Sequence, residues 1–336
     1  MAVIGILGSG TWGTALAIHL AECGHAVRLW SAFPKEIEEL SASHKHPNLP
    51  GAVLPASIRL VTEEAEAVEG ADLLVLAVPS IYTRQTARRF KPFIREGQIV
   101  INVAKGIEEG SLLTQSEITA EELPMAEIAV LSGPSHAEEV SIGMPTAVVA
   151  AAGKRETAAY IQEVFMDPRF RVYISPDRKG VEVGGSLKNV IALAAGMADG
   201  LGYGDNTMAA LITRGITELS RLGEAMGGSA ETFYGLTGLG DLIVTCESRH
   251  SRNRRAGVLI GQGKSMQEAM DEVKMVVEGV YSAKAGKQLG ERYGVPMPII
   301  EEVNRILFEG KPPADAVGDL MCRDKAMEHP RLSWQG

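Results

Sequence analysis

The apolar residues in the first 180 positions gather in short continuous runs, and stretches of helical periodicity separate these runs. An apolar run without polar alternation is typical of a parallel strand that is buried on both faces of its sheet. The strands predicted from these runs are Val3–Leu7, Ala26–Trp30, Leu73–Val78, Ile99–Val103 and Ile128–Leu131. The helices predicted between them include Thr14–Cys23, Ile81–Phe90 and Ser111–Thr119. Because strands and helices alternate, we expect an α/β fold with a doubly wound, mainly parallel sheet.

The periodicity of the chain changes near Pro176. Before it, strands are predicted at Thr146–Ala150 and Arg171–Ile174, with a helix around Glu156–Phe165 between them. Beyond it, strand signals almost vanish, and apolar residues recur at the spacing of amphipathic helices. The helices predicted there are Glu182–Met197, Met208–Met226, Ser265–Glu272, Ser282–Arg292 and Pro298–Phe308. We therefore expect an α/β domain over residues 1–180, a mainly α-helical domain over residues 181–336, and a ligand cleft between them.

The composition indicates a folded protein of ordinary polarity. Its 336 residues are 45% hydrophobic and 22% charged, and a chain of this length usually divides into two domains. The net charge of −9 argues against a nucleic-acid partner and against a membrane-surface protein. The N-terminus lacks the pattern of a signal peptide, and no apolar run approaches the roughly 20 residues of a membrane span. We therefore expect a cytoplasmic protein.

The cysteines Cys23, Cys246 and Cys322 lie far apart along the chain. They form no Cys-x-x-Cys pair and no even set with disulfide spacing. Isolated cysteines of this kind usually pack as small hydrophobic residues. We expect each of them to be reduced and buried, and we predict no metal site.

A glycine-rich turn follows the first predicted strand. The sequence Gly8-Ser9-Gly10-Thr11-Trp12-Gly13 has the spacing G-x-G-x-x-G. Six such residues could form a simple turn, but here a strand precedes them, and a helix and a second strand follow. In this context Gly8 permits the tight turn, Gly10 lets a pyrophosphate approach the backbone, and Gly13 lets the helix pack closely on the strand. Because the N-terminus of a helix binds phosphate, we predict a Rossmann domain that binds a dinucleotide.

The choice between NAD and NADP stays open at the end of the second strand. Sites that prefer NAD usually carry an acidic residue there for the ribose 2′-hydroxyl. The sequence instead reads Trp30-Ser31-Ala32-Phe33, with no acid before Glu36. No arginine follows the strand to hold a 2′-phosphate either, because Arg28 lies within the strand and Lys35 lies beyond it.

Polar residues interrupt the apolar pattern in three further places. Lys105 directly follows a strand, and the carboxyl end of a parallel strand faces the ligand crevice. The sequence Ser-Gly-Pro-Ser-His-Ala at 132–137 follows the next strand, and its His136, taken alone, is typical of a packing residue. Lys188 lies within an apolar helix, where a lysine must either extend to the surface or line a polar cleft.

These motifs, with three more beyond them, resemble the bacterial NAD(P)-dependent glycerol-3-phosphate dehydrogenase family. The motifs occur in the family's order: G-x-G-x-x-G at 8–13, AKG at 104–106, SGPSHAEEV at 132–140, LKNVIAL at 187–193, GLGDL at 238–242, SRN at 251–253 and VVEG at 276–279. Together they are far more specific than the glycine fingerprint. The resemblance implies interconversion of sn-glycerol 3-phosphate and dihydroxyacetone phosphate with NAD or NADP, in the service of phospholipid synthesis. It also implies a homodimer.

The resemblance further implies roles for individual residues. Lys188 would be the general acid–base of the reaction. The residues implied to contact the substrate are Lys105, Gly133, Ser135, Lys188, Asp241, Ser251, Arg252 and Asn253. The residues implied to contact the nucleotide are Gly8, Gly10, Thr11, Trp12, Gly13, Lys105, Ala137, Arg252, Val276 and Glu278.

Elementary chemistry supports these roles. Hydride leaves C2 of a secondary alcohol only if the hydroxyl proton also leaves, so a base must lie within hydrogen-bond reach. Lys188 can be that base if burial and a neighbouring cation, for which Lys105 is the candidate, lower its pKa. The triplet 251–253 offers a hydroxyl, a guanidinium and an amide to a phosphate, although alone it would indicate a solvated, basic helix start. Asp241 could bind substrate hydroxyls, orient Lys188 or cap a helix.

Two other functions share part of this pattern. A two-domain reductase of the ketopantoate or phosphogluconate type would show the same fold pattern, but would not be expected to combine LKNVIAL with SRN. A catalytically silent dinucleotide sensor would keep residues 8–13 and lose Lys105, Lys188 and Arg252. This sequence keeps all three.

Overall fold

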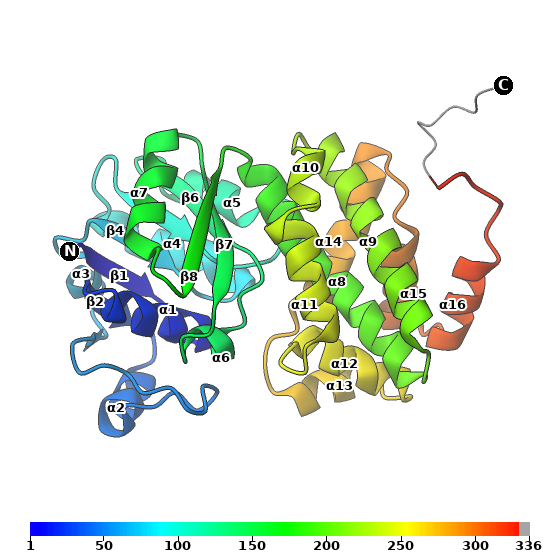
Figure 1. Cartoon of the computed structure of the whole chain (residues 1–336), viewed down its shortest axis with the longest axis horizontal. Helices are drawn as coiled ribbons and strands as arrows, with labels where there is room; N and C mark the ends of the chain where they lie inside the picture. The colour runs from blue at the N-terminus through cyan, green and yellow to red at the C-terminus, as the bar shows by residue number, and fades with distance from the viewer. Residues whose placement is uncertain (329–336) are drawn as a thin grey trace.

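The structure, a computed structural model, describes residues 1–328, and the first half of the chain forms one eight-stranded sheet (Figure 1). The strands are β1 (Val3–Leu7), β2 (Ala26–Trp30), β3 (Arg59–Val61), β4 (Leu73–Leu76), β5 (Ile99–Asn102), β6 (Glu127–Ser132), β7 (Thr146–Ala152) and β8 (Phe170–Ser175). Their order is β3-β2-β1-β4-β5-β6-β7-β8, and neighbours run parallel except β6 and β7. The doubly wound, mainly parallel sheet predicted from the sequence is confirmed.

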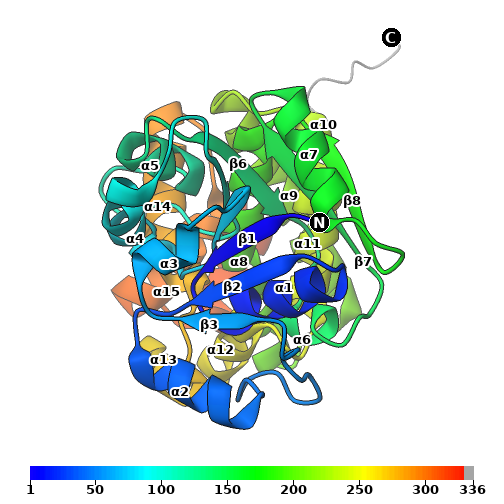
Figure 2. The ribbon, with the colours of Figure 1, turned by 90° about the vertical axis from the view of Figure 1, so that its left-hand side faces the viewer.

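Helices cover both faces of this sheet (Figure 2). Successive side chains of a strand point to opposite faces, so a strand of consecutive apolar residues has an apolar surface on each face that must be covered. Ile6 of β1 packs on the face covered by α1 (Thr11–Glu22) and α7 (Arg155–Phe165). Leu7, the next residue, packs on the face covered by α4 (Thr83–Phe90). The other helices of this half are α2 (Pro34–Ser43), α3 (Glu64–Val68), α5 (Gln115–Glu122) and α6 (Ala137–Val140), with 3-10 turns at Ser80–Tyr82 and Lys91–Phe93.

Three local features of the sheet half differ from the predictions. The helix α1 begins at Thr11, three residues before the predicted Thr14. The edge strand β3 was not predicted, because its three residues begin with an exposed arginine and form no long apolar run. The helix α5 begins at Gln115 and not at Ser111, because Thr114 is its N-cap and forms a capping box with Glu117. Leu112, with φ of 61°, lies in the left-handed region and cannot continue a right-handed helix.

The second half of the chain is helical and lies beside the sheet along the long axis of the molecule (Figure 1). Its helices are α8 (Arg178–Gly200), α9 (Asp205–Ala225), α10 (Ala230–Phe233), α11 (Asp241–Glu247), α12 (Arg252–Gly261), α13 (Met266–Val273), α14 (Glu278–Tyr293), α15 (Pro298–Glu309) and α16 (Pro313–Met321), with a π-helical turn at Leu236–Gly240. The predicted mainly α-helical half is confirmed for the described residues, while positions 329–336 of that prediction lie outside them. None of the helices within residues 1–328 is long and apolar enough to cross a membrane.

The buried helix α8 forms the centre of this half, and α9, α12 and α14 pack around it. Glycines let α8 and α12 approach closely, because a Cβ atom on Gly257 would lie 2.1 Å from the carbonyl oxygen of Leu193. A Cβ atom on Gly196 would likewise lie 2.1 Å from the carbonyl oxygen of Arg254. This contact fixes the start of α12 against α8, which positions two parts of the site described next.

Candidate active site

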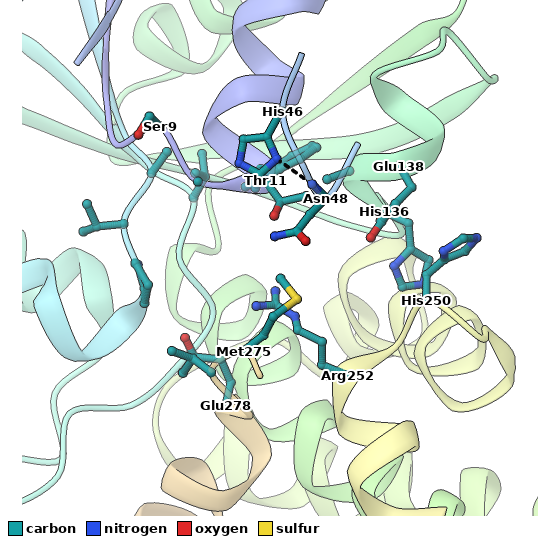
Figure 3. Close-up of a pocket in the computed structure, with 18 of the residues that line it drawn as sticks. Ser9, Thr11, His46, Asn48, His136, Glu138, His250, Arg252, Met275 and Glu278 are labelled. Carbon is teal, nitrogen blue, oxygen red and sulfur yellow. Dashed lines mark hydrogen bonds between the residues drawn. The ribbon is translucent and has the colours of Figure 1, made fainter. Parts of the chain in front are cut away.

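A cavity of about 980 Å³ lies between the carboxyl ends of the central strands and the helical half (Figure 3). The loops after β1, β4, β5 and β6, together with α2 and the segment after it, form one wall, and α8, α11, α12 and the segment before α14 form the other. Open α/β sheets bind ligands in this crevice. The sequence-predicted site residues that line it are Gly10, Thr11, Trp12, Lys105, Ser135, Ala137, Lys188, Asp241, Ser251, Arg252, Asn253, Val276 and Glu278.

The glycine-rich turn shapes the end of the cavity at which α1 begins. Gly8 has φ of 129°, and a Cβ atom on it would lie 2.5 Å from the carbonyl oxygen of Ala77. A Cβ atom on Gly13 would lie 2.0 Å from the carbonyl oxygen of Gly8, so both positions require glycine for the backbone itself. At Gly10, which lines the cavity, no atom lies within 4 Å of the Cβ position. Because no side chain caps α1, its first N–H groups are available to an anion, and the turn fits a diphosphate.

Two lysines meet one carboxylate deep in the cavity. Asp241, the first residue of α11, is 2% exposed, and its Oδ1 accepts a hydrogen bond from Lys188 Nζ at 2.5 Å. Its Oδ2 accepts a hydrogen bond from Lys105 Nζ at 2.7 Å, and Lys105 also donates to the carbonyl oxygen of Gly133 at 3.0 Å. Lys188 comes from α8 and Lys105 from the loop after β5. The carboxylate of Asp241 therefore joins the two halves of the chain at this point.

The electrostatics of this cluster set the protonation states of its members. Burial lowers the pKa of Lys188 to about 8; the Asp241 carboxylate opposes this shift, and the charge of Lys105 adds to it. Burial alone would raise the pKa of Asp241, but the two ammonium groups outweigh burial and hold that pKa below its ordinary value. Asp241 therefore stays ionised at neutral pH, while Lys188 can take up or release a proton near that pH. A general acid–base needs this property.

Thr245 belongs to the same cluster and was not predicted from the sequence. Its Oγ1 accepts a hydrogen bond from Lys188 Nζ at 2.5 Å and donates one to the carbonyl oxygen of Asp241 at 2.6 Å. The ammonium group of Lys188 is thus held between a carboxylate and a hydroxyl. The one available signal was the four-residue spacing from Asp241, which places both residues on one helix face. That signal was missed because the pattern predicted no helix at α11.

His136 also lines the cavity, beside His250, and their ring centroids lie 6.0 Å apart (Figure 3). Burial lowers the pKa of His136 to about 4, with a further contribution from the charge of Lys188. The imidazole is therefore neutral at neutral pH and cannot replace Lys188 as a proton donor there. Its Nε2 is buried and has no hydrogen-bond partner among the residues that the structure describes.

The triplet 251–253 enters the cavity at the start of α12. The Ser251 hydroxyl oxygen accepts a hydrogen bond from the backbone N–H of Arg254 at 3.2 Å and caps the helix. The Asn253 amide donates to Asn189 Oδ1 at 3.0 Å, and its own Oδ1 accepts the backbone N–H of Gly279 at 2.9 Å. Both side chains therefore hold the local backbone and still offer an O–H or N–H to a ligand. The side chain of Arg252 extends into the cavity (Figure 3).

The loop after β6 contributes through its backbone as well as its side chains. Gly133 has φ of 146°, and a Cβ atom on it would lie 2.9 Å from the Cα atom of Val148 in β7. Its carbonyl oxygen accepts a hydrogen bond from Ser135 Oγ at 3.0 Å in addition to that from Lys105. Gly133 thus turns the chain toward the cavity, where Ser135 and Ala137 form the wall.

Glu278, the first residue of α14, links the helical half of the chain to the loop after β4. One carboxylate oxygen accepts the backbone N–H of Ser80 at 3.2 Å, and the other accepts the Ser80 hydroxyl at 2.5 Å. Burial raises the pKa of Glu278, while these hydrogen bonds oppose the shift. Ser80 follows β4, so this pair joins the start of α14 to the loop after β4 at the edge of the cavity, which Val276 also lines.

The cysteines match the expectation of burial only in part. Cys246 is buried in the helical core, whereas Cys23 is half-buried and Cys322 is exposed, so the prediction is wrong for those two. Both follow the last turn of a helix, at the C-caps of α1 and α16, where the neighbouring chain covers the side chain incompletely. An apolar character read from the sequence does not determine how much chain covers a helix end.

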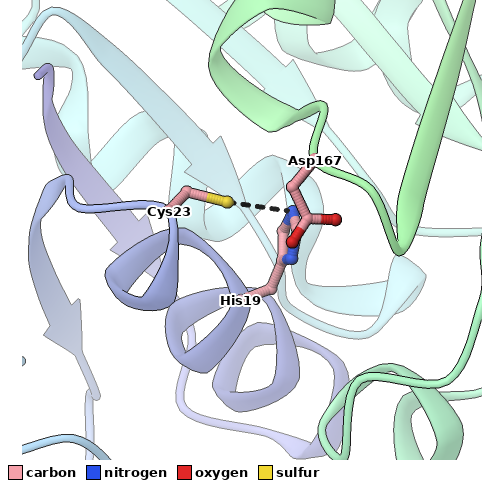
Figure 4. Close-up of side chains that lie close together, drawn as sticks. All are labelled: His19, Cys23 and Asp167. Atoms are coloured by element: carbon pink, nitrogen blue, oxygen red, sulfur yellow. Dashed lines mark hydrogen bonds between the residues drawn. The ribbon is translucent and has the colours of Figure 1, made fainter.

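Cys23, His19 and Asp167 lie close enough together to offer ligand atoms to a metal (Figure 4). The imidazole Nε2 of His19 already donates to the carbonyl oxygen of Phe165 at 2.7 Å. One oxygen of Asp167 accepts the backbone N–H groups that close the turn before β8. Burial raises the pKa of Cys23 to about 11, which disfavours the thiolate that a metal binds. Of these side chains, His19 holds the end of α7 against α1.

Known families and proteins are similar to nearly the whole length of this chain. The family described as NAD-dependent glycerol-3-phosphate dehydrogenase N-terminus matches residues 3–158, and the family described as its C-terminus matches residues 177–318. A protein of Agathobacter rectalis named glycerol-3-phosphate dehydrogenase NAD(P)+ is 60% identical and covers 100% of both chains. A protein of the same name from Fusobacterium nucleatum is 57% identical and covers 98% of this chain and 99% of its own.

Solved structures show the same relationship. The crystal structure of glycerol-3-phosphate dehydrogenase from Coxiella burnetii superposes with a TM-score of 0.92 and is 40% identical in sequence. The match covers 96% of this chain and 99% of the other. The chain therefore belongs to the family of NAD-dependent glycerol-3-phosphate dehydrogenases, oxidoreductases that interconvert sn-glycerol 3-phosphate and dihydroxyacetone phosphate with NAD or NADP.

Proposed function

We propose that this chain performs that reaction at the Lys105–Asp241–Lys188 cluster, with Lys188 as the general acid–base. The observation that carries the proposal is the position of Lys188, which is 4% exposed, hydrogen-bonded to a buried carboxylate and in the wall of the cavity. With a pKa of about 8, this lysine is present in both protonation states near neutral pH. Each direction of the reaction needs one of those states.

In the oxidative direction, the neutral amine of Lys188 accepts the C2 hydroxyl proton of glycerol 3-phosphate as the C2–H bond breaks. The C2–O bond becomes the carbonyl of dihydroxyacetone phosphate, and Lys188 is left as an ammonium group. The nicotinamide cofactor, when bound, accepts the hydride in this direction and supplies it in the other. In the reductive direction the Lys188 ammonium returns its proton to the carbonyl oxygen and, with Lys105, stabilises the negative charge that develops there.

Arg252 is the residue that we propose binds the substrate phosphate. A guanidinium can bind two phosphate oxygens at once, and Ser251 and Asn253 can add a hydroxyl and an amide beside it. The residues that we propose for substrate contact are Lys105, Gly133, Ser135, Lys188, Asp241, Ser251, Arg252 and Asn253. Gly133 would contact the substrate through its backbone, because it has no side chain and the place of its Cβ atom is closed by β7.

The nucleotide would extend from the N-terminus of α1 toward Lys188. Gly10 leaves space for the pyrophosphate, and Thr11 and Trp12 form the first turn of the helix beside it. Gly8 and Gly13 shape this turn. The remaining residues proposed to contact the nucleotide are Lys105, Ala137, Arg252, Val276 and Glu278, all of which line the cavity.

The test is a substrate panel, followed at 340 nm, with NADH and NADPH as reductants. We expect turnover with dihydroxyacetone phosphate, little turnover with dihydroxyacetone, which lacks the phosphate, and none with ketopantoate. Turnover with ketopantoate in place of dihydroxyacetone phosphate would favour a reductase of that type. Binding of NADH, seen by fluorescence, without turnover of any of these substrates would favour a dinucleotide sensor.

We further propose a homodimer in the cytoplasm that supplies glycerol 3-phosphate for phospholipid synthesis. The product carries one phosphate and two free hydroxyls, as the acyl acceptor of a glycerophospholipid must. We also propose a division near residue 180 into a dinucleotide domain and a substrate domain, which the separate family matches support. Light scattering of the purified protein gives the oligomeric state, and loss of the gene should create a requirement for added glycerol 3-phosphate.

A further inference from the structure

A carboxylate lies at the end of β2, although the strand itself carries none. Glu36, in the first turn of α2, accepts two hydrogen bonds on Oε2, from Ser9 Oγ at 2.6 Å and from Ser31 Oγ at 2.6 Å. Ser9 belongs to the glycine-rich turn after β1, and Ser31 directly follows β2. The Ser31 oxygen in turn accepts the backbone N–H of Phe33 at 3.2 Å. Both serines are buried, so the carboxylate is held over the ends of the two strands.

This place has a defined role in dinucleotide-binding sheets. The acidic residue of NAD-preferring sites stands at the end of the second strand and binds the 2′-hydroxyl of the adenosine ribose. Glu36 reaches the same place from the following helix, and it lines the cavity together with Ser9 and Gly10. One of its carboxylate oxygens holds the two serines, and the other remains for a ligand hydroxyl. A 2′-phosphate would instead meet a negative charge at that point.

We propose that Glu36 recognises the ribose 2′-hydroxyl and makes this chain prefer NAD(H) to NADP(H). The inference rests on the proposed dinucleotide site and adds a coenzyme preference to it. The hydroxyl of NADH can donate a hydrogen bond to the carboxylate, whereas the 2′-phosphate of NADPH can only bring like charges together. Like charges placed against each other at a binding interface cost enough to decide between two ligands.

The other charged groups at this end of the cavity do not reverse that preference. Glu39 and Lys45 also line it, so two carboxylates oppose one exposed ammonium group. His46 lines it too, and burial lowers the pKa of His46 although the Glu36 charge opposes this shift, so the ring is neutral at neutral pH. Arg28 of β2 is directed away, because its guanidinium donates to the backbone carbonyl of Glu69. Lys45 is therefore the one rival group for a 2′-phosphate on this wall.

The experiment measures dissociation constants for NADH and NADPH by fluorescence titration, which needs no turnover. The variants are Glu36→Gln, the matched control Glu38→Gln, and Lys45→Ala. Glu38 lies on the same helix and carries the same charge, but it is exposed, does not line the cavity and lacks the two serine hydrogen bonds. Glu38→Gln therefore repeats the change in net charge but not the change at the strand ends. If neither coenzyme binds the wild-type protein, the dinucleotide site itself is wrong, which separates that failure from a failure of the inference.

We expect the wild-type protein to bind NADH at least about 100-fold more tightly than NADPH. Glu36→Gln should shrink this ratio at least tenfold, mainly through tighter binding of NADPH, and Glu38→Gln should leave the ratio nearly unchanged. Equal binding of the two coenzymes by the wild-type protein would overturn the inference. So would equal effects of the two glutamate variants, or a preference for NADPH that disappears in Lys45→Ala.

Discussion

Replacement of Lys188 by alanine tests the centre of the proposed mechanism. The change removes the proton acceptor and one of the two ammonium groups that contact Asp241. The fold should persist, because Asp241 keeps Lys105 as an ion-pair partner and is not left as an unpaired buried charge. NADH binding should persist as well, because the N-terminus of α1 is unchanged.

The size of the loss follows from the two roles of the lysine. General acid–base catalysis contributes about 10²–10⁴ in rate. Loss of a group that stabilises the developing oxyanion costs about 10²–10³ in kcat. The two effects overlap in one side chain, so we expect Lys188→Ala to lose at least about 10³-fold in kcat. That loss corresponds to about 4 kcal/mol in transition-state stabilisation.

The assay is dihydroxyacetone phosphate reduction at 340 nm, with thermal unfolding and NADH fluorescence as controls. Lys188→Arg keeps a positive charge beside Asp241 but cannot release a proton. When glycerol 3-phosphate oxidation is followed instead, this variant should therefore be nearly as inactive as Lys188→Ala. Lys179→Ala is the matched control, because Lys179 lies on the same helix and pairs with Glu117 outside the cavity. A folded Lys188→Ala protein that retains a tenth of the wild-type kcat would refute the assigned role.

Three further predictions address proton transfer, the cofactor and the phosphate. The kcat/KM for glycerol 3-phosphate oxidation should rise with pH and level off above about 8, because only the neutral amine of Lys188 can accept the proton; a flat profile would contradict this. Gly10→Val should abolish NADH binding in fluorescence titration without unfolding the protein, because its side chain would occupy only the space left for the pyrophosphate. Arg252→Lys should lose about 2–4 kcal/mol in transition-state binding of dihydroxyacetone phosphate and almost nothing with dihydroxyacetone. Equal losses on both substrates would show that Arg252 does not act through the phosphate, once its effect on cofactor affinity has been measured separately.

The sequence by itself determined the sheet and the nucleotide turn. Continuous apolar runs gave β1, β2, β4, β5 and β6 because a strand buried on both faces has no polar side, and this is a local property. Gly8 and Gly13 could be identified because a backbone that has no room for a Cβ atom admits only one residue type. The start of α5 and the edge strand β3 were missed, because a capping box and an edge position depend on a few residues with little apolar content.

The site divides in the same way. Lys188 was identifiable because a lysine in an apolar helix breaks a strong pattern. The motifs shared with the family then indicated the other residues of the site. Only the tertiary structure showed that one carboxylate, Asp241, joins Lys188 to Lys105, and that Thr245 completes the contact. The placement of Glu36 over the ends of β1 and β2 was equally invisible. Periodicity reports which face of an element is buried, whereas pKa values and ligand recognition depend on distances between elements, and only the packed chain fixes those distances.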